Sequence, residues 1–164
     1  MDNTHLHLIL NHFPILGTLF ALCILGWGIL RKNPSLENAG FITLIIISLI
    51  TIPVFLTGKE AHEPLDQVPG VSDHYLEEHE ELAGKAIWLM FATGAMALIT
   101  MIASKAGKSR KVILNVITLL LAAGSLGIMT VVGNYGGKIR HSELRDDAEV
   151  SADESMETHD HSAH

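Results

Sequence analysis

The stretch His5–Pro14, HLHLILNHFP, opens an apolar segment that continues without a charged residue to Leu30. Three imidazoles and a proline therefore stand at the entrance of a run long enough to cross a membrane as a helix. An unsatisfied polar group in hydrocarbon costs several kcal/mol. Histidines in this position need a polar partner or a ligand, and the rest of the sequence brings more histidines to the same end.

The whole chain is more apolar than an ordinary soluble domain. It has 164 residues, of which 48% are hydrophobic, and a mean hydropathy of +0.33. Four runs could span about 30 Å of hydrocarbon as helices: residues 8–30, 41–57, 82–103 and 112–132. No segment alternates polar and apolar residues as spanning β-strands do. The sequence predicts an all-α integral membrane four-helix bundle in residues 1–145, followed by an acidic, histidine-rich tail, 146–164, without fixed structure.

Prolines and capping residues predict where the helices bend and end. Pro14 is tolerated in a first helical turn but would kink a helix already under way. Pro53 is expected to bend the outer half of the second span. Residues 31–40 are expected to form the turn between the first two spans. Ser72 is expected to cap a helix that begins at Asp73 and descends into the third span.

Lysine and arginine predict the orientation of the spans. The loop between spans one and two and the loop between spans three and four hold six basic residues against one acid, Glu37: Arg31, Lys32, Lys105, Lys108, Arg110 and Lys111. By the positive-inside rule these loops face the cytoplasm, so both termini lie outside. The outer side then carries all ten histidines and the other 17 of the 18 acids, and the net charge of -7 belongs to that face. It is not a signal for nucleic-acid binding.

The single cysteine, Cys23, lies in the middle of the first span. One cysteine excludes an internal disulfide, a Cys-x-x-Cys-His haem attachment and a thiolate zinc cluster. Any cofactor must therefore be held by nitrogen, oxygen or methionine sulfur.

Four histidines come from four different spans and are expected to converge at the outer end: His12, His62, His79 and His141. Inward histidines on facing helices are how bundles hold haem or metal ions. Gly58, Gly133 and Gly137 would leave space beside the imidazoles, enough for a flat macrocycle. Counting residues along each span places the four rings at different depths, so we expect them to ligate in pairs and to hold one or two b-type haems. His12 with any of the other three is the expected pair; the pairing itself stays open.

Three segments resemble a known bacterial family. The opening His12-Phe13-Pro14-Ile15, the Thr57-Gly58 exit of the second span and the terminal Gly136–His141 are similar to those of a four-helix membrane family of the domain of unknown function 2231 type, some members of which are fused to c-type cytochrome domains. The resemblance covers residues 8–141, although Ile139-Arg140 replaces the Val-Tyr of the family's ending. It implies an electron-transfer setting in the bacterial envelope, with no assigned reaction. Together with the orientation predicted from lysine and arginine, it places the chain in the inner membrane with the histidine-rich side in the periplasm.

The function expected from these features is electron transfer through a bis-histidine haem, in which no coordination position stays open for oxygen chemistry. A periplasmic c-type cytochrome or a quinone is the expected partner, with membrane lipid around the bundle; small residues in the third and fourth spans suit close packing in a homo-oligomer or a respiratory complex. No hydrolase, phosphate-loop or zinc-protease motif is present, so a stand-alone enzyme is the poorer interpretation.

Two alternatives to haem remain. Imidazoles also suit copper, zinc or nickel, and the tail residues His159, His161 and His164 are typical of a flexible tract that collects divalent ions. The same tract could equally be a solubilising tail. The second alternative to haem is that the chain is a cofactor-free subunit of a larger respiratory complex.

Overall fold

The computed structural model describes residues 3–65, 71–103, 108–139 and 141, with side chains from residues 7–61, 71–103, 110–139 and 141. Its described elements are all helices: α1 (Asn3–Leu10), α2 (His12–Leu30), α3 (Pro34–Leu65), α4 (Asp73–Ala103) and α5 (Lys108–Lys138). Four segments are long and apolar enough to cross a membrane: His7–Leu30, Pro34–Ala61, Asp73–Ala103 and Arg110–Lys138. The chain is a multi-pass membrane protein with an all-α fold, as the sequence predicts. The predicted tail, 146–164, lies outside the described residues.

The first span is broken once, at Asn11, between α1 and α2. Pro14 explains the break, because it has no N–H to donate to the carbonyl of residue 10 and its ring crowds that carbonyl. The Asn11 N–H still donates to the His7 carbonyl at 2.9 Å, so the two pieces run on as one bent span. Because the helix begins well before the proline, it carries His7 into the bundle.

The turn between α2 and α3 is shorter than expected, because α3 begins at Pro34. Lys32 has a positive φ of 51°, and the Asn33 N–H donates to the Gly28 carbonyl at 2.8 Å, as in a Schellman ending. The Asn33 side-chain oxygen then accepts from the N–H groups of Ser35 and Leu36, at 3.0 and 3.3 Å. One helix is closed and the next is capped within three residues.

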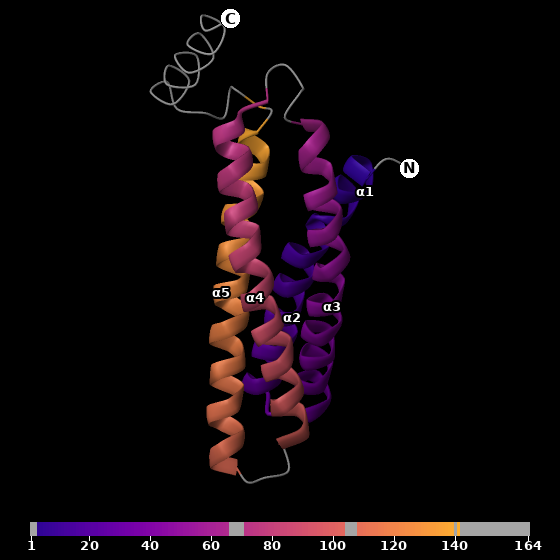
Figure 1. Cartoon of the computed structure of the whole chain (residues 1–164). Coiled ribbons are helices and arrows are strands. Elements are labelled where there is room, and N and C mark those ends of the chain that lie inside the picture. Colours follow the sequence, from indigo (N-terminus) through magenta and orange to yellow (C-terminus); the bar gives the residue numbers. More distant parts are fainter. Residues whose placement is uncertain (1–2, 66–70, 104–107, 140, 142–164) are drawn as a thin grey trace, which may run out of the picture.

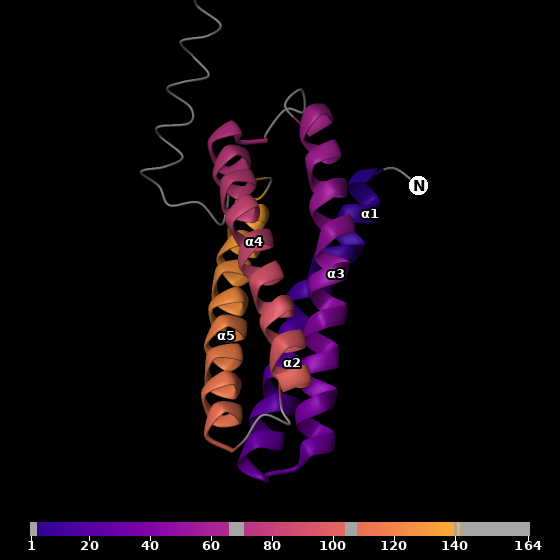
Figure 2. The same ribbon diagram turned by 60° about the horizontal axis from the view of Figure 1, so that its bottom comes forward.

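Two helical hairpins make up the bundle, α1 and α2 with α3, and α4 with α5 (Figure 1). Around the bundle, α2 packs on α3 and α5, and α4 packs on the same two helices. Figure 2 shows the hairpins close together at the end of the α2–α3 turn and diverging toward the other end. We call the end that holds His7 and His79 the histidine end, and the end that holds Arg31, Lys32 and Lys111 the basic end.

Each helix turns one face inward, with contact residues spaced alternately by three and four. This is the repeat that keeps one face of a helix against its neighbours over many turns. On the first span the series runs through His7, Asn11, Pro14, Thr18, Ala21, Leu25 and Gly28; on α4 it runs through Leu76, His79, Ala83, Ala86, Met90, Thr93, Ala97 and Thr100. Both series consist of buried or half-buried residues, and both contain a histidine.

α3 continues without interruption through Pro53 to Leu65. The Thr57 hydroxyl donates to the carbonyls of Pro53 and Val54, at 2.8 and 3.0 Å. Pro53 leaves the Leu49 carbonyl without its usual N–H donor, a loss that membrane-spanning helices tolerate. The last turns of α3, from Val54 onward, lie against the first span, where Val54 and Thr57 contact His7.

The histidine end of the second hairpin has its own small core. Val71, Tyr75, Leu76 and Ile139 pack together there. The Ser72 N–H donates to the Ile139 carbonyl at 3.1 Å, and the Leu76 N–H donates to the Ser72 carbonyl, so α4 does begin after Ser72 as expected. The Ser72 hydroxyl itself is buried without a hydrogen-bond partner among the described residues, so the side-chain cap expected from the sequence is not formed.

Candidate histidine pair at the end of the bundle

His7 faces the second helix of its own hairpin. Its Nδ1 lies 3.0 Å from the Val54 carbonyl oxygen and 3.5 Å from the Thr57 hydroxyl. The flat side of the ring rests on Gly58, where an added Cβ would lie 2.9 Å from His7 Cε1. The missing side chain at Gly58 is thus what lets the imidazole lie against α3.

His79 is held in the same way in the other hairpin. We call the valine carbonyl and the glycine that hold each imidazole its seat: Val54 and Gly58 for His7, and Val132 and Gly136 for His79. The Nδ1 atom of His79 lies 2.9 Å from the Val132 carbonyl oxygen. An added Cβ at Gly136 would lie 3.2 Å from His79 Cε1 and 3.3 Å from its Nδ1. A ring from α4 is therefore seated on α5 by one carbonyl and one glycine.

The two seats are related residue by residue. In each hairpin the first helix supplies the histidine, and the second supplies a valine carbonyl followed four residues later by a glycine, Val54 with Gly58 and Val132 with Gly136. Residues four apart lie one above the other on a helix face. The two hairpins are thus repeats of one arrangement, and they present their histidines to each other across the bundle.

The two imidazoles are near neighbours and perpendicular. Their ring centroids are 6.5 Å apart and the ring planes make an angle of 88°. A carbonyl oxygen can only accept, so Nδ1 of each ring must donate the hydrogen bond and carry the proton. The lone pair of each neutral ring is then on Nε2, the arrangement in which a second hydrogen bond fixes the tautomer and orientation of a metal-binding histidine.

A groove of about 410 Å³ runs beside the pair, between α3 and α4. Its lining consists of Phe55, Lys59, Glu77, Glu80, Glu81 and Gly84. Phe55 adjoins Val54, and Glu80 adjoins His79, so the groove lies at the level of the two rings. Lys59 contributes a cation to it, held 5.7 Å from the centre of the Phe55 ring.

The structure brings His7, and not His12, next to His79. His12 is exposed, in a second and largely apolar groove that it shares with Phe13, Phe20 and Ile47. His12 follows His7 by five positions, a rotation of about 140° around a helix, so the two side chains leave the first span in different directions. The apolar groove opens between α2 and α3, on the side that faces lipid.

The other predicted site residues are placed as follows. His62 belongs to α3, but its side chain lies outside the described residues, as do the tail histidines His159, His161 and His164. His141 follows the end of α5 and is exposed. Gly133 contacts α2, since an added Cβ would lie 3.3 Å from Ile15 Cδ1. Gly58 is beside an imidazole as expected, although that of His7, and Gly136, which the sequence does not single out, is beside His79.

A signal in the sequence could have identified His7. Counting back from Gly28 by alternate steps of three and four through Leu25, Ala21 and Thr18 reaches His7 and passes over His12. The same count from Thr100 reaches His79. The seats on the partner helices carry no such signal, because any residue has a carbonyl and many glycines line these spans.

The pair stands alone as a donor set in the part of the chain whose side chains are described. No group of three or more histidine, cysteine, aspartate or glutamate side chains comes together there as a metal site would require. Searches against family models, curated proteins and solved structures find no match to this chain.

Proposed function

We propose that the chain is a membrane cytochrome that holds one b-type haem between His7 and His79 and takes part in electron transfer. The observation that carries the proposal is the facing pair of imidazoles, each held by a backbone carbonyl on its partner helix, with centroids 6.5 Å apart. The haem would be ligated by Nε2 of both rings.

The separation of the rings suits one metal between them. Two imidazoles on opposite sides of a metal, with metal–nitrogen bonds of about 2.0 Å, have centroids about 6.3 Å apart. The observed 6.5 Å is within a few tenths of an ångström of that value. The separation of the two rings is therefore compatible with a metal held between them.

The number of donors favours haem over a free ion. Zinc is typically bound by three or four protein ligands, whereas two imidazoles face each other here and the described residues add no third donor. A porphyrin brings its own four nitrogens and needs only axial ligands. Among the described side chains, two histidines would complete a haem site but would leave a zinc site short.

The protein's own groups would set the properties of the site. The Val54 and Val132 carbonyls keep the proton on Nδ1 and orient the rings. Gly58 and Gly136 leave room for them. When bound, the haem supplies one-electron chemistry, and two histidine ligands leave no position for oxygen. Lys59 is the cation in the neighbouring groove that could pair with a haem carboxylate.

The orientation follows from the basic end. Arg31, Lys32, Arg110 and Lys111 lie there, and the positive-inside rule assigns that end to the cytoplasm. The histidine end then faces the periplasm of a bacterial inner membrane, where a c-type cytochrome or a membrane quinone would exchange electrons with it. The resemblance to the four-helix family of unknown function, with its cytochrome fusions, supports the same setting.

The test is the spectrum of the protein purified in detergent after expression with sufficient haem. We expect a Soret band and a reduced-minus-oxidised α-band in the wild type. His7→Ala and His79→Ala should each abolish at least nine-tenths of the bound haem, about 1.4 kcal/mol or more in affinity. His12→Ala is the matched control, because it removes an imidazole from the same span, and it should leave the spectrum unchanged.

Perpendicular imidazole planes add a second readout. In ferric low-spin haem, rings at a right angle give a strongly anisotropic electron paramagnetic resonance signal, and parallel rings give a resolved rhombic one. The 88° between His7 and His79 predicts the first kind. A colourless wild type, or haem lost on removing His12 but kept without His7, would refute the proposal; bound copper or nickel in its place would be seen by elemental analysis.

A further inference from the structure

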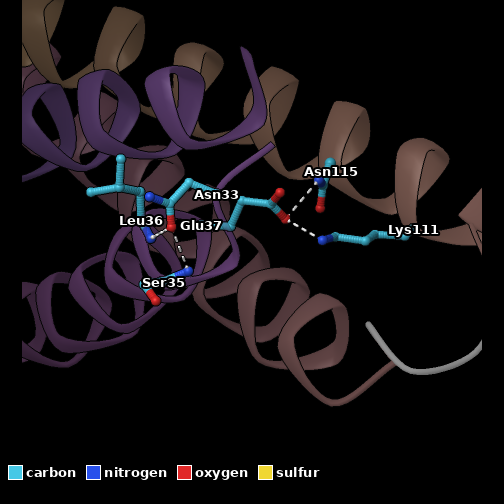
Figure 3. Close-up of polar contacts among 6 residues, drawn as sticks. All are labelled: Asn33, Ser35, Leu36, Glu37, Lys111 and Asn115. Carbon is cyan, nitrogen blue, oxygen red and sulfur yellow. Dashed lines mark hydrogen bonds and ion pairs between the residues drawn. The ribbon is translucent and has the colours of Figure 1, made fainter. Parts of the chain in front are cut away.

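A second polar cluster lies at the basic end, across the other diagonal of the bundle. Glu37 on α3 is 5% exposed, and its Oε2 lies 2.8 Å from Lys111 Nζ on α5. The Asn115 side-chain amide, one turn along α5, donates to the same carboxylate at 3.3 Å. Figure 3 shows the three side chains meeting between the two helices, with Asn33 capping the start of α3 beside them. We call Glu37, Lys111 and Asn115 the clasp.

The distance along the helix from the clasp to the histidine seat is the same in the two hairpins. Glu37 is seventeen residues before Val54, and Asn115 is seventeen residues before Val132. Each histidine seat therefore stands about 26 Å along its helix from one half of the clasp. The helix that seats His7 and the helix that seats His79 are tied to each other directly at the clasp.

The tie is costly for a buried contact. The Glu37 side chain is 6% exposed and the Lys111 side chain 29%. The desolvation cost, several kcal/mol for a buried ion, therefore falls mainly on Glu37, and an apolar pair of similar size is often as stable or more so. Asn115 Oδ1 is moreover buried with no hydrogen-bond partner among the described residues. What a buried polar contact adds, compared with apolar packing, is a fixed register, because only one alignment of the helices satisfies it.

We infer that the clasp is a positioning element that sets the angle between the two hairpins and thereby the gap between His7 and His79. Over about 26 Å of helix, a change of about 5° in that angle moves the far ends by about 2 Å. A ligand site tolerates errors of about 0.5 Å. A loose clasp would therefore spoil the pair even though it lies at the other end of the molecule.

The inference rests on the proposed function only in treating the gap between His7 and His79 as a haem site. The first test therefore measures the distance between the hairpins in protein without haem. Spin labels at Lys59→Cys on α3 and Lys85→Cys on α4, both exposed, report the distance between hairpins at the histidine end in a Cys23→Ser background. In the full chain prepared without haem, Lys111→Met should shift the mean distance by about 2 Å or broaden its distribution at least twofold. Arg110→Met is the control: it removes an exposed charge one residue away and should change nothing.

Two double variants separate positioning from mere stability. Glu37→Met with Lys111→Met should melt at or above the temperature of Lys111→Met, because no buried charge is left unpaired, yet keep the altered distance distribution of Lys111→Met. Glu37→Lys with Lys111→Glu restores a pair and should return the distance distribution to that of the wild type. A wild-type distance distribution in Lys111→Met or in the methionine pair would overturn the role of the clasp whatever the haem result.

The last experiment measures haem affinity and the electron paramagnetic resonance signal of the haem-loaded protein. Lys111→Met should lower haem affinity at least tenfold and alter the electron paramagnetic resonance signal, while the charge-swapped pair returns both toward wild type. If the wild type binds no haem, the proposed function fails and the distance measurements still decide the clasp. If haem binds to Lys111→Met as it does to the wild type, the clasp does not position the ligands.

Discussion

At the scale of single residues, the candidate site depends on two glycines as much as on two histidines. Gly58 and Gly136 are the residues against which the imidazoles lie, and any side chain there enters the space of a ring. The histidines supply ligand atoms, whereas the glycines and the valine carbonyls determine where those atoms are held.

Gly136→Ala tests this dependence. The new Cβ would lie 3.2 Å from His79 Cε1 and 3.3 Å from Nδ1, closer than most Cβ contacts, so we expect the ring to shift by a few tenths of an ångström and to disturb its hydrogen bond to Val132. Changes to groups that orient a metal ligand typically cost about 10-fold to 100-fold in affinity, and we expect a haem affinity at least about 10-fold lower. Haem titration followed at the Soret band measures it.

The control is Gly127→Ala, on the helix that carries Gly136. Nothing lies within 4 Å of a Cβ built there. Alanine should therefore leave haem binding as it is, and by helix propensity it should not weaken α5. Equal effects of the two alanines would show that Gly136 is not part of the seat.

At the scale of elements, the first hairpin is built on close approach of backbones at the basic end. A Cβ at Gly28 would lie 2.7 Å from the Glu37 backbone nitrogen, and one at Gly40 would lie 2.7 Å from Leu25 Cβ. Small residues at helix contacts are the usual means of bringing spanning helices together, because lipid offers no hydrophobic drive for it. The same closeness places Glu37 at the start of α3 where it can reach α5.

Gly28→Ala should therefore loosen the hairpin. The new Cβ would clash with the backbone of α3 at Glu37, which cannot move away as a flexible side chain can. We therefore expect the free energy of unfolding to fall by about 1–3 kcal/mol. Unfolding in mixed detergent micelles, followed by circular dichroism, measures the change. Gly26→Ala, two residues earlier and with nothing within 4 Å of its Cβ, should be neutral; a comparable loss there would mean that helix propensity and not packing governs these positions.

At the scale of the whole molecule, the sign of charge differs between the two ends. The basic end presents Arg31, Lys32 and Arg110, all exposed, whereas Asp73, Glu77 and Glu81 are exposed near the histidine end. Lysine and arginine are retained on the cytoplasmic side during insertion. The distribution therefore predicts one orientation for all four spans together.

Single cysteines test that orientation. In a Cys23→Ser background, Glu77→Cys at the histidine end should react with a membrane-impermeant maleimide in intact spheroplasts. Ser35→Cys at the basic end should react only after the membrane is permeabilised; both positions are exposed in the folded chain. The reverse pattern would place the histidine pair on the cytoplasmic side and remove a periplasmic carrier as its partner.

The sequence alone determined the four spans, because only self-bonded helices of sufficient apolar length can cross hydrocarbon. It also placed the histidines at one end and identified His79 and Gly58 as members of that end. It favoured His12, whereas the structure brings His7 next to His79; the two histidines stand five positions apart on one span, both before Pro14.

Only the tertiary structure decided which imidazoles meet. That choice depends on how each helix is rotated about its axis and on the break at Asn11, and both are set by packing against other helices. The valine carbonyls, Gly136 and the clasp of Glu37 with Lys111 emerge only at that level. Apolar length is a property of each segment by itself, whereas rotation belongs to the helices together, since no span turns a particular face inward until its neighbours are in place.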